Sequence, residues 1–132
     1  MPRTAIGYLR HDCASPADLP KLRDLITRYA QAHGLHLAST FEAEPDHFMP
    51  LLVLLEQYHL AGAEVIIAPT AEHVWSARRA ITLQADMAIA APGEIYAKGI
   101  QWAPWTPNEG TAPTTPTYRP RLSLVADDEQ PA

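Results

Sequence analysis

The sequence predicts an α/β fold in which a mainly parallel sheet is flanked by helices in three layers. Short apolar runs alternate along the chain with longer segments of helical periodicity, and Gly and Pro residues stand between them. Strands that alternate with helices form parallel sheets with right-handed crossovers. We therefore expect one α/β domain over residues 1–103. Repeated prolines predict a largely extended or disordered tail over 104–132.

The first half of the domain begins with a buried strand over residues 4–10. Asp18 can cap the helix that follows, and Pro20 is tolerated in its first turn. Apolar residues then recur at helical spacing until Gly34, which is a suitable C-terminal stop. The alternating segment 35–41 predicts a second strand.

The second half begins with a helix that starts at Asp46 or Pro50 and presents a broad apolar face up to Gly62. Segment 65–68 is short and β-branched and is followed by Pro69, so it predicts an interior strand. Three weaker elements are expected after it: a short helix over 71–79, a strand within 81–91, and a strand or loop over 94–102.

Composition limits the possible functions. The 132 residues are 47% hydrophobic, which suits one domain that folds unaided. The formal charge of −5 and the absence of a Lys/Arg block argue against broad electrostatic binding to nucleic acid. DNA therefore stays a disfavoured partner, and a protein partner or a homo-oligomer is expected instead.

The lone cysteine, Cys13, excludes an internal disulfide and a cysteine-based zinc cluster, and it fits a reducing cytoplasm. The N-terminus lacks a signal-peptide core, and no apolar run approaches the roughly 18 residues of a membrane span. The histidines do not follow a metal-binding spacing. We expect a cytoplasmic protein with no membrane contact, metal or cofactor.

Ionisable residues gather where two of the expected strands end. Arg10, His11, Asp12 and Cys13 follow the first strand, and the segment after the third strand contains Glu72 and His73. Because parallel strands place their carboxyl ends at one edge of the sheet, these groups are expected to meet in a crevice there.

Three segments occur in an order and at spacings that are also found in a known protein family. They are the strand that ends in Tyr8-Leu9-Arg10, the helix start Met49-Pro50-Leu51 and segment 61–69. They resemble the N-terminal catalytic domain of the resolvase/invertase family of serine recombinases. In that family the opening strand carries Tyr-x-Arg-Val-Ser, and a helix begins with Arg-Pro-x-Leu. The resemblance covers roughly residues 4–80 and implies a resolvase-like fold.

The departures from this pattern fall on the residues that would cut DNA. Asp12 stands at the position of the serine nucleophile, and Met49 replaces the arginine before the proline. Only Arg10 remains among the phosphate-binding charges. At about 4 Å and an effective dielectric near 20, a carboxylate repels a phosphate charge by roughly 4 kcal/mol. The vestigial crevice is expected to contain Arg10, His11, Asp12, Cys13, Met49, Glu72, His73 and Ser76.

Three functions follow as hypotheses. The first is a non-catalytic accessory or regulatory module that binds a protein. The second is a recombinase relative that still binds or processes DNA with partners. The third is an enzyme with a repurposed crevice, in which Cys13 is the nucleophile and His73 the base.

Aromatic and tail residues offer further candidates. Trp75 stands where the family has glycine, so it could fill the old crevice, whereas Trp102 is expected to pack on the domain. Segment 118–125 could add as a strand to a sheet edge, or have no structure. The candidate partner-binding residues are Trp105, Tyr118, Leu122 and Leu124.

Overall fold

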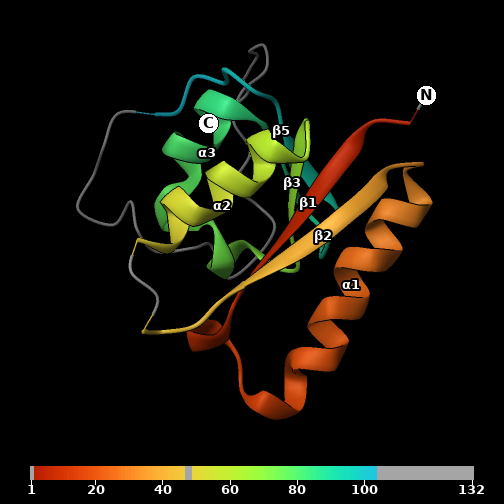
Figure 1. Ribbon diagram of the computed structural model, residues 1–132, viewed down its shortest axis with the longest axis vertical. Coiled ribbons are helices and arrows are strands. Elements are labelled where there is room, and N and C mark those ends of the chain that lie inside the picture. Colours follow the sequence, from red (N-terminus) through yellow and green to blue (C-terminus); the bar gives the residue numbers. More distant parts are fainter. Residues whose placement is uncertain (1, 47–48, 104–132) are drawn as a thin grey trace, which may run out of the picture.

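The computed structural model describes residues 2–46 and 49–103, and it has the predicted α/β fold (Figure 1). Its sheet has five strands in the order β2-β1-β3-β4-β5. The first four are parallel, and β5 runs antiparallel to β4. The strands are β1 (Thr4–Arg10), β2 (His36–Ala43), β3 (Val65–Ala68), β4 (Asp86–Ile89) and β5 (Glu94–Tyr96).

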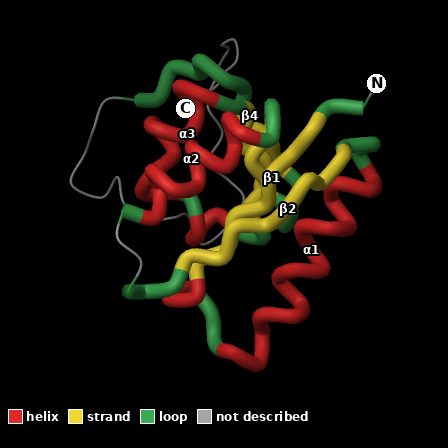
Figure 2. The backbone as a smooth tube through the Cα atoms, viewed as in Figure 1, coloured by secondary structure: helices red, strands yellow, loops and turns green. Residues whose placement is uncertain are grey.

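Helices cover both faces of the sheet, as Figure 2 shows. Helix α1 (Leu19–Ala32) packs on one face, and α2 (Pro50–Leu60) and α3 (Arg78–Gln84) pack on the other. Strand β1 supplies both cores because successive side chains point to opposite faces. Ile6 and Tyr8 join the core on the α2/α3 side, whereas Ala5 and Leu9 join the core under α1.

Gly7 lets helix α1 and strand β2 approach the middle of β1. A Cβ atom at this position would lie 2.6 Å from Thr40 Oγ1 and 2.8 Å from Ile26 Cγ2. These distances are well below ordinary contact, so close packing on this face requires a residue without a side chain.

The short buried runs were predicted well, and the segment after β3 was not. Instead of one helix over 71–79, two 3₁₀ turns, Ala71–His73 and Trp75–Ala77, precede α3. The strand expected within 81–91 is confined to β4, because residues up to Gln84 are helical. Arg78, Ile81 and Thr82 are buried at helical spacing, and the charge of Arg78 obscures that period in the sequence.

Helix α2 begins at Pro50, which is one of the two starts that the sequence predicted. Asp18 occupies the position before α1, but its side chain makes no capping bond and instead accepts a hydrogen bond from Ser15 Oγ at 3.0 Å. Within the described part of the chain, every helix is too short or too polar to cross a membrane.

Candidate functional site

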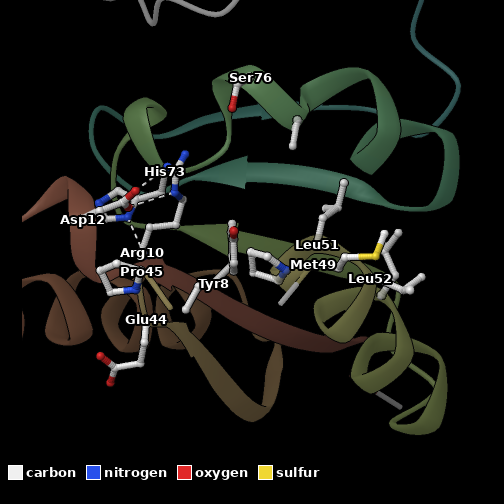
Figure 3. A pocket seen from close by; sticks show the side chains of 14 residues that line it. Tyr8, Arg10, Asp12, Glu44, Pro45, Met49, Leu51, Leu52, His73 and Ser76 are labelled. Atoms are coloured by element: carbon white, nitrogen blue, oxygen red, sulfur yellow. Dashed lines mark hydrogen bonds and ion pairs between the residues drawn. The ribbon is translucent and has the colours of Figure 1, made fainter. Parts of the chain in front are cut away.

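A cavity of about 470 Å³ lies at the carboxyl end of β1, between the start of α2 and the turns that follow β3 (Figure 3). This is the sheet edge at which the sequence placed the crevice. One wall is polar and includes Tyr8, Arg10, Asp12, His73 and Ser76. The opposite wall is apolar and includes Pro45, Met49, Pro50, Leu51, Leu52 and Leu55.

Arg10 and Asp12 form a two-point ion pair on the polar wall. Arg10 Nε lies 3.1 Å from Asp12 Oδ1, and Arg10 Nη2 lies 2.7 Å from Asp12 Oδ2. The hydrogen bonds from Arg10 lower the pKa of Asp12, so the carboxylate stays ionised. The guanidinium group of Arg10 is therefore already paired with the carboxylate of Asp12, two residues further along the chain.

His73 is almost fully buried, with 1% of its surface exposed, and it ties the turn after β3 to the end of β1. Its Nδ1 accepts a hydrogen bond from the Arg10 backbone N–H at 2.8 Å. Burial, and next the charge of Arg10, lower the pKa of His73 to about 4. The ring is therefore neutral near pH 7, and because Nδ1 is an acceptor, its proton is on Nε2.

His11 turns away from the cavity toward strand β2. Its Nε2 lies 2.8 Å from Glu42 Oε1, and its Nδ1 lies 3.4 Å from Glu44 Oε1. Glu42 also accepts two hydrogen bonds from Arg23, at 2.6 and 2.9 Å. Arg23, with a smaller contribution from His11, lowers the pKa of Glu42 to about 2. This network joins β1, β2 and α1 and leaves His11 outside the cavity lining.

Cys13 and Glu72 also lie outside the cavity lining. Cys13 Sγ is 3.7 Å from Asp12 Oδ1 and 3.7 Å from the backbone oxygen of Glu72, whose side chain is exposed. Burial raises the pKa of the Cys13 thiol, and no hydrogen bond joins it to His73 within the described residues. A thiol held protonated and a histidine with a pKa of about 4 are poorly suited to act as nucleophile and base.

Met49 enters the cavity from an unusual backbone conformation. Its φ of 51° and ψ of 61° lie in the left-handed region, which costs a residue with a side chain roughly 1–2 kcal/mol. The conformation sets the side chain at the start of α2, where Met49 and Leu52 are 52% and 59% exposed. The apolar wall is therefore open to solvent.

Tyr8 is a site residue that the sequence analysis named only as part of a motif. It is 4% exposed, and its ring stacks on Phe41 with centroids 6.1 Å apart. Its hydroxyl points into the cavity between the polar and apolar walls (Figure 3). The leucines of α2 were also missed as site residues. The broad apolar face of that helix was the available signal, since one core-facing stripe does not need all of them.

Trp75 does not fill the crevice, so that expectation was wrong. It is absent from the cavity lining and is buried in the core on the α2/α3 face of the sheet, where it makes edge contacts with Tyr96 and Trp102 at centroid distances of 6.1 and 5.7 Å. Arg78 Cζ lies 4.6 Å from the Trp75 ring and 5.0 Å from the Trp102 ring. Trp102 packs on the domain as predicted, and its Nε1–H donates to Thr82 Oγ1 at 2.9 Å.

The structure thus brings together Arg10, Asp12, Met49, His73 and Ser76 of the predicted crevice. Trp105, Tyr118, Leu122 and Leu124 lie outside the described residues. Over residues 2–46 and 49–103, no three His, Cys, Asp or Glu side chains are grouped so that they could hold a metal ion.

The fold is similar to that of a solved structure, the N-terminal catalytic domain of TP901-1 integrase. The TM-score is 0.53, and the match covers 70% of this chain and 81% of that chain at 12% sequence identity. No protein-family profile matches the chain, and no curated protein matches it. At this identity the likeness shows the fold alone, which is similar to that of the integrase catalytic domain.

Proposed function

We propose that this protein is a non-catalytic, resolvase-like domain that acts as an accessory or regulatory module by binding a protein. The observation that carries the proposal is the two-point ion pair between Arg10 and Asp12 at the carboxyl end of β1. In the family that the sequence resembles, this strand end carries the nucleophile and part of the phosphate-binding charge.

The chemistry of the cavity supports this proposal. Phosphoryl transfer needs a nucleophile and several cations that offset charge on the phosphate oxygens. Arg10 is the cavity's arginine, and its charge is already balanced by Asp12. His73 is neutral and adds no positive charge near pH 7. A phosphate would therefore meet a site with no net positive charge.

A trapping experiment tests the absence of catalysis. The full chain is incubated with supercoiled plasmid DNA and denatured, and the products are resolved for nicked DNA and for protein joined covalently to DNA. We expect neither product. Nicked plasmid bound covalently to the protein would overturn the proposal, provided that Arg10→Ala abolishes it.

The second candidate function is DNA binding as part of a recombination assembly, which the likeness to an integrase catalytic domain favours. Salt dependence distinguishes the two functions. A recombinase-like interface would neutralise many phosphates and give a steep fall of affinity with salt, whereas this chain should give a logarithmic slope no steeper than about −1. Fluorescence anisotropy with a labelled duplex at several salt concentrations measures that slope.

The protein-binding part of the proposal rests on exposed apolar side chains and on the tail sequence. Leu60 and Leu83 are 82% and 72% exposed on α2 and α3, and Ile95 is 54% exposed on the edge strand β5. Segment 118–125 has the alternating apolar pattern of a strand that could pair with a sheet edge of a partner or of a second copy.

Paired tail variants test this part. Leu122→Asp together with Leu124→Asp places two charges on one side of an added strand, whereas Ser123→Asp places one on the other side. In sedimentation velocity with the full chain, alone and with a co-purified partner, the double variant should dissociate the complex and Ser123→Asp should leave it intact. Equal behaviour of the two variants would contradict strand addition.

A further inference from the structure

Two side chains of the cavity lining are largely buried, but each has a polar atom that is accessible and makes no hydrogen bond within the described residues. Tyr8 and His73 are 4% and 1% exposed, and both line the cavity. No group within residues 2–46 and 49–103 hydrogen-bonds to the Tyr8 hydroxyl or to Nε2 of His73. The Tyr8 hydroxyl and Nε2 of His73 remain accessible to solvent, so both can donate a hydrogen bond to a ligand that enters the cavity.

Both groups are hydrogen-bond donors near neutral pH. Burial raises the pKa of Tyr8, so its hydroxyl keeps its proton. His73 is neutral and carries its proton on Nε2, because Nδ1 accepts from the Arg10 N–H. Ser76 adds a third hydroxyl, which points toward the cavity from the turn before α3 (Figure 3). A ligand atom held here must therefore be an acceptor.

The apolar wall of the cavity determines which kind of group the remainder of the ligand can have. Met49, Leu51 and Leu52 line it with aliphatic and thioether surface. The volume of about 470 Å³ lies within the roughly 300–1,000 Å³ of small-molecule pockets. A ligand that fills this half of the cavity has an apolar body, because a polar one would lose its hydration without gaining partners.

Charge excludes a phosphate as the acceptor group. Asp12 and Glu44 line the same cavity, and the charge of Arg10 is balanced by Asp12. A dianionic phosphate would be repelled by these two carboxylates more strongly than a singly charged carboxylate would, and a neutral carbonyl oxygen would not be repelled.

We propose that the cavity binds a small acyl compound, in which a carbonyl-type oxygen accepts hydrogen bonds from Tyr8 and His73 while an apolar chain lies along Met49, Leu51 and Leu52. The inference rests on the proposed function in one respect, because it requires that the crevice binds rather than cuts. The ligand would then be the signal to which the accessory domain responds.

Methionine methyl groups give a direct measurement of binding. In the full chain labelled with ¹³C at the methionine methyls, Met49 lines the cavity and Met87 is buried in the core as an internal reference. Titration with octanamide and with octanoate should shift the Met49 signal and leave that of Met87 in place. Octane, which has the same carbon chain and no acceptor, should leave both signals unchanged.

The two acyl probes distinguish the sources of the acceptor oxygen. Tighter binding of octanoate assigns a carboxylate, and tighter binding of octanamide assigns a neutral carbonyl; either result supports the proposal. Binding should be constant between pH 6 and 8, because neither Tyr8 nor His73 titrates there. No shift of Met49 with either acyl probe, or an equal shift with octane, would overturn it.

Two tyrosine variants provide the matched comparison. Tyr8→Phe removes the hydroxyl and keeps the ring on Phe41, so the acyl probes should bind about fivefold more weakly. Tyr29→Phe removes a hydroxyl on the α1 side of the sheet and should bind them as the unmodified chain does. Equal affinity of the two variants refutes the role of Tyr8. If Tyr8→Phe does not fold, the comparison of octanamide with octane on the unmodified chain still decides.

The DNA-trapping experiment keeps the two proposals apart. Covalent DNA product with normal acyl binding would refute only the absence of catalysis. Absent acyl binding with no DNA product would refute only the ligand.

Discussion

Acidification should destabilise the protein through His73 in a range where most surface groups have little effect. The folded-state pKa of His73 is lowered from 6.5 to about 4, so the unfolded chain binds this proton more readily than the folded protein. Stability from this group is complete above pH 6.5 and is lost as the pH falls toward 4. The difference of about 2.5 pH units corresponds to about 3 kcal/mol.

Structure explains why protonation is so unfavourable at this position. The ring is buried, Arg10 lies nearby, and Nδ1 already accepts the Arg10 N–H at 2.8 Å. A proton on Nδ1 would replace that hydrogen bond by a contact between two donors. Asp12 acts in the opposite direction, but its carboxylate is held by the Arg10 side chain.

Urea denaturation between pH 4.5 and 7.5 measures the effect. The unmodified protein should lose stability as the pH falls, and His73→Asn should lose about 2 kcal/mol less over the same range, because the variant lacks the buried imidazole whose pKa differs between the folded and unfolded states. His59→Asn, on the exposed end of α2, is the matched control and should follow the unmodified protein. Parallel curves for the unmodified protein and His73→Asn would refute the reasoning.

Three further changes test other parts of the structure. Gly7→Ala places a Cβ 2.6 Å from Thr40 Oγ1 and should lower the free energy of unfolding by about 1–3 kcal/mol in urea; a change below about 0.5 kcal/mol would contradict the close packing. Asp12→Asn releases Arg10 from a part-exposed ion pair, so stability should change by less than about 1 kcal/mol while the salt slope of DNA binding steepens toward −1; an unchanged slope would show that Arg10 does not reach phosphate. Trp102→Ala removes one ring beside Arg78 and should cost about 3–5 kcal/mol by calorimetry or denaturation, with a smaller loss indicating that the segment after β5 is weakly attached.

The fold was predictable where burial alone decides the structure. Strands β1 and β3 are short buried runs between turn signals, and their neighbours at the sheet edge follow from the rule for parallel strands. Helix α3 was not predictable, because Arg78 is buried against Trp75 and Trp102 rather than exposed. Because the charged Arg78 occupies a buried position of α3 beside two aromatic rings, the apolar residues of this helix do not recur at helical spacing in the sequence.

The candidate site was predictable in part for the same reason. Arg10, Asp12 and His73 follow strands and therefore meet at one edge. The side-chain directions were not accessible from sequence: His11 turns to Glu42 because Arg23 fixes that carboxylate from α1. Tyr8 was overlooked as a site residue because a tyrosine within a buried strand is usually part of the core.

The two proposals, an absence of phosphoryl transfer and the binding of an apolar ligand, follow from the same physical features of the cavity. In the family pattern that the sequence resembles, arginine precedes the proline at the helix start, and this chain has Met49 there, at the open apolar wall. A carboxylate in place of the serine neutralises the remaining Arg10. A site with balanced charge and one apolar wall repels a polyanion but loses little by desolvating a neutral chain. The two donors on the cavity wall, Tyr8 and His73, would then provide the specificity that an apolar wall alone lacks.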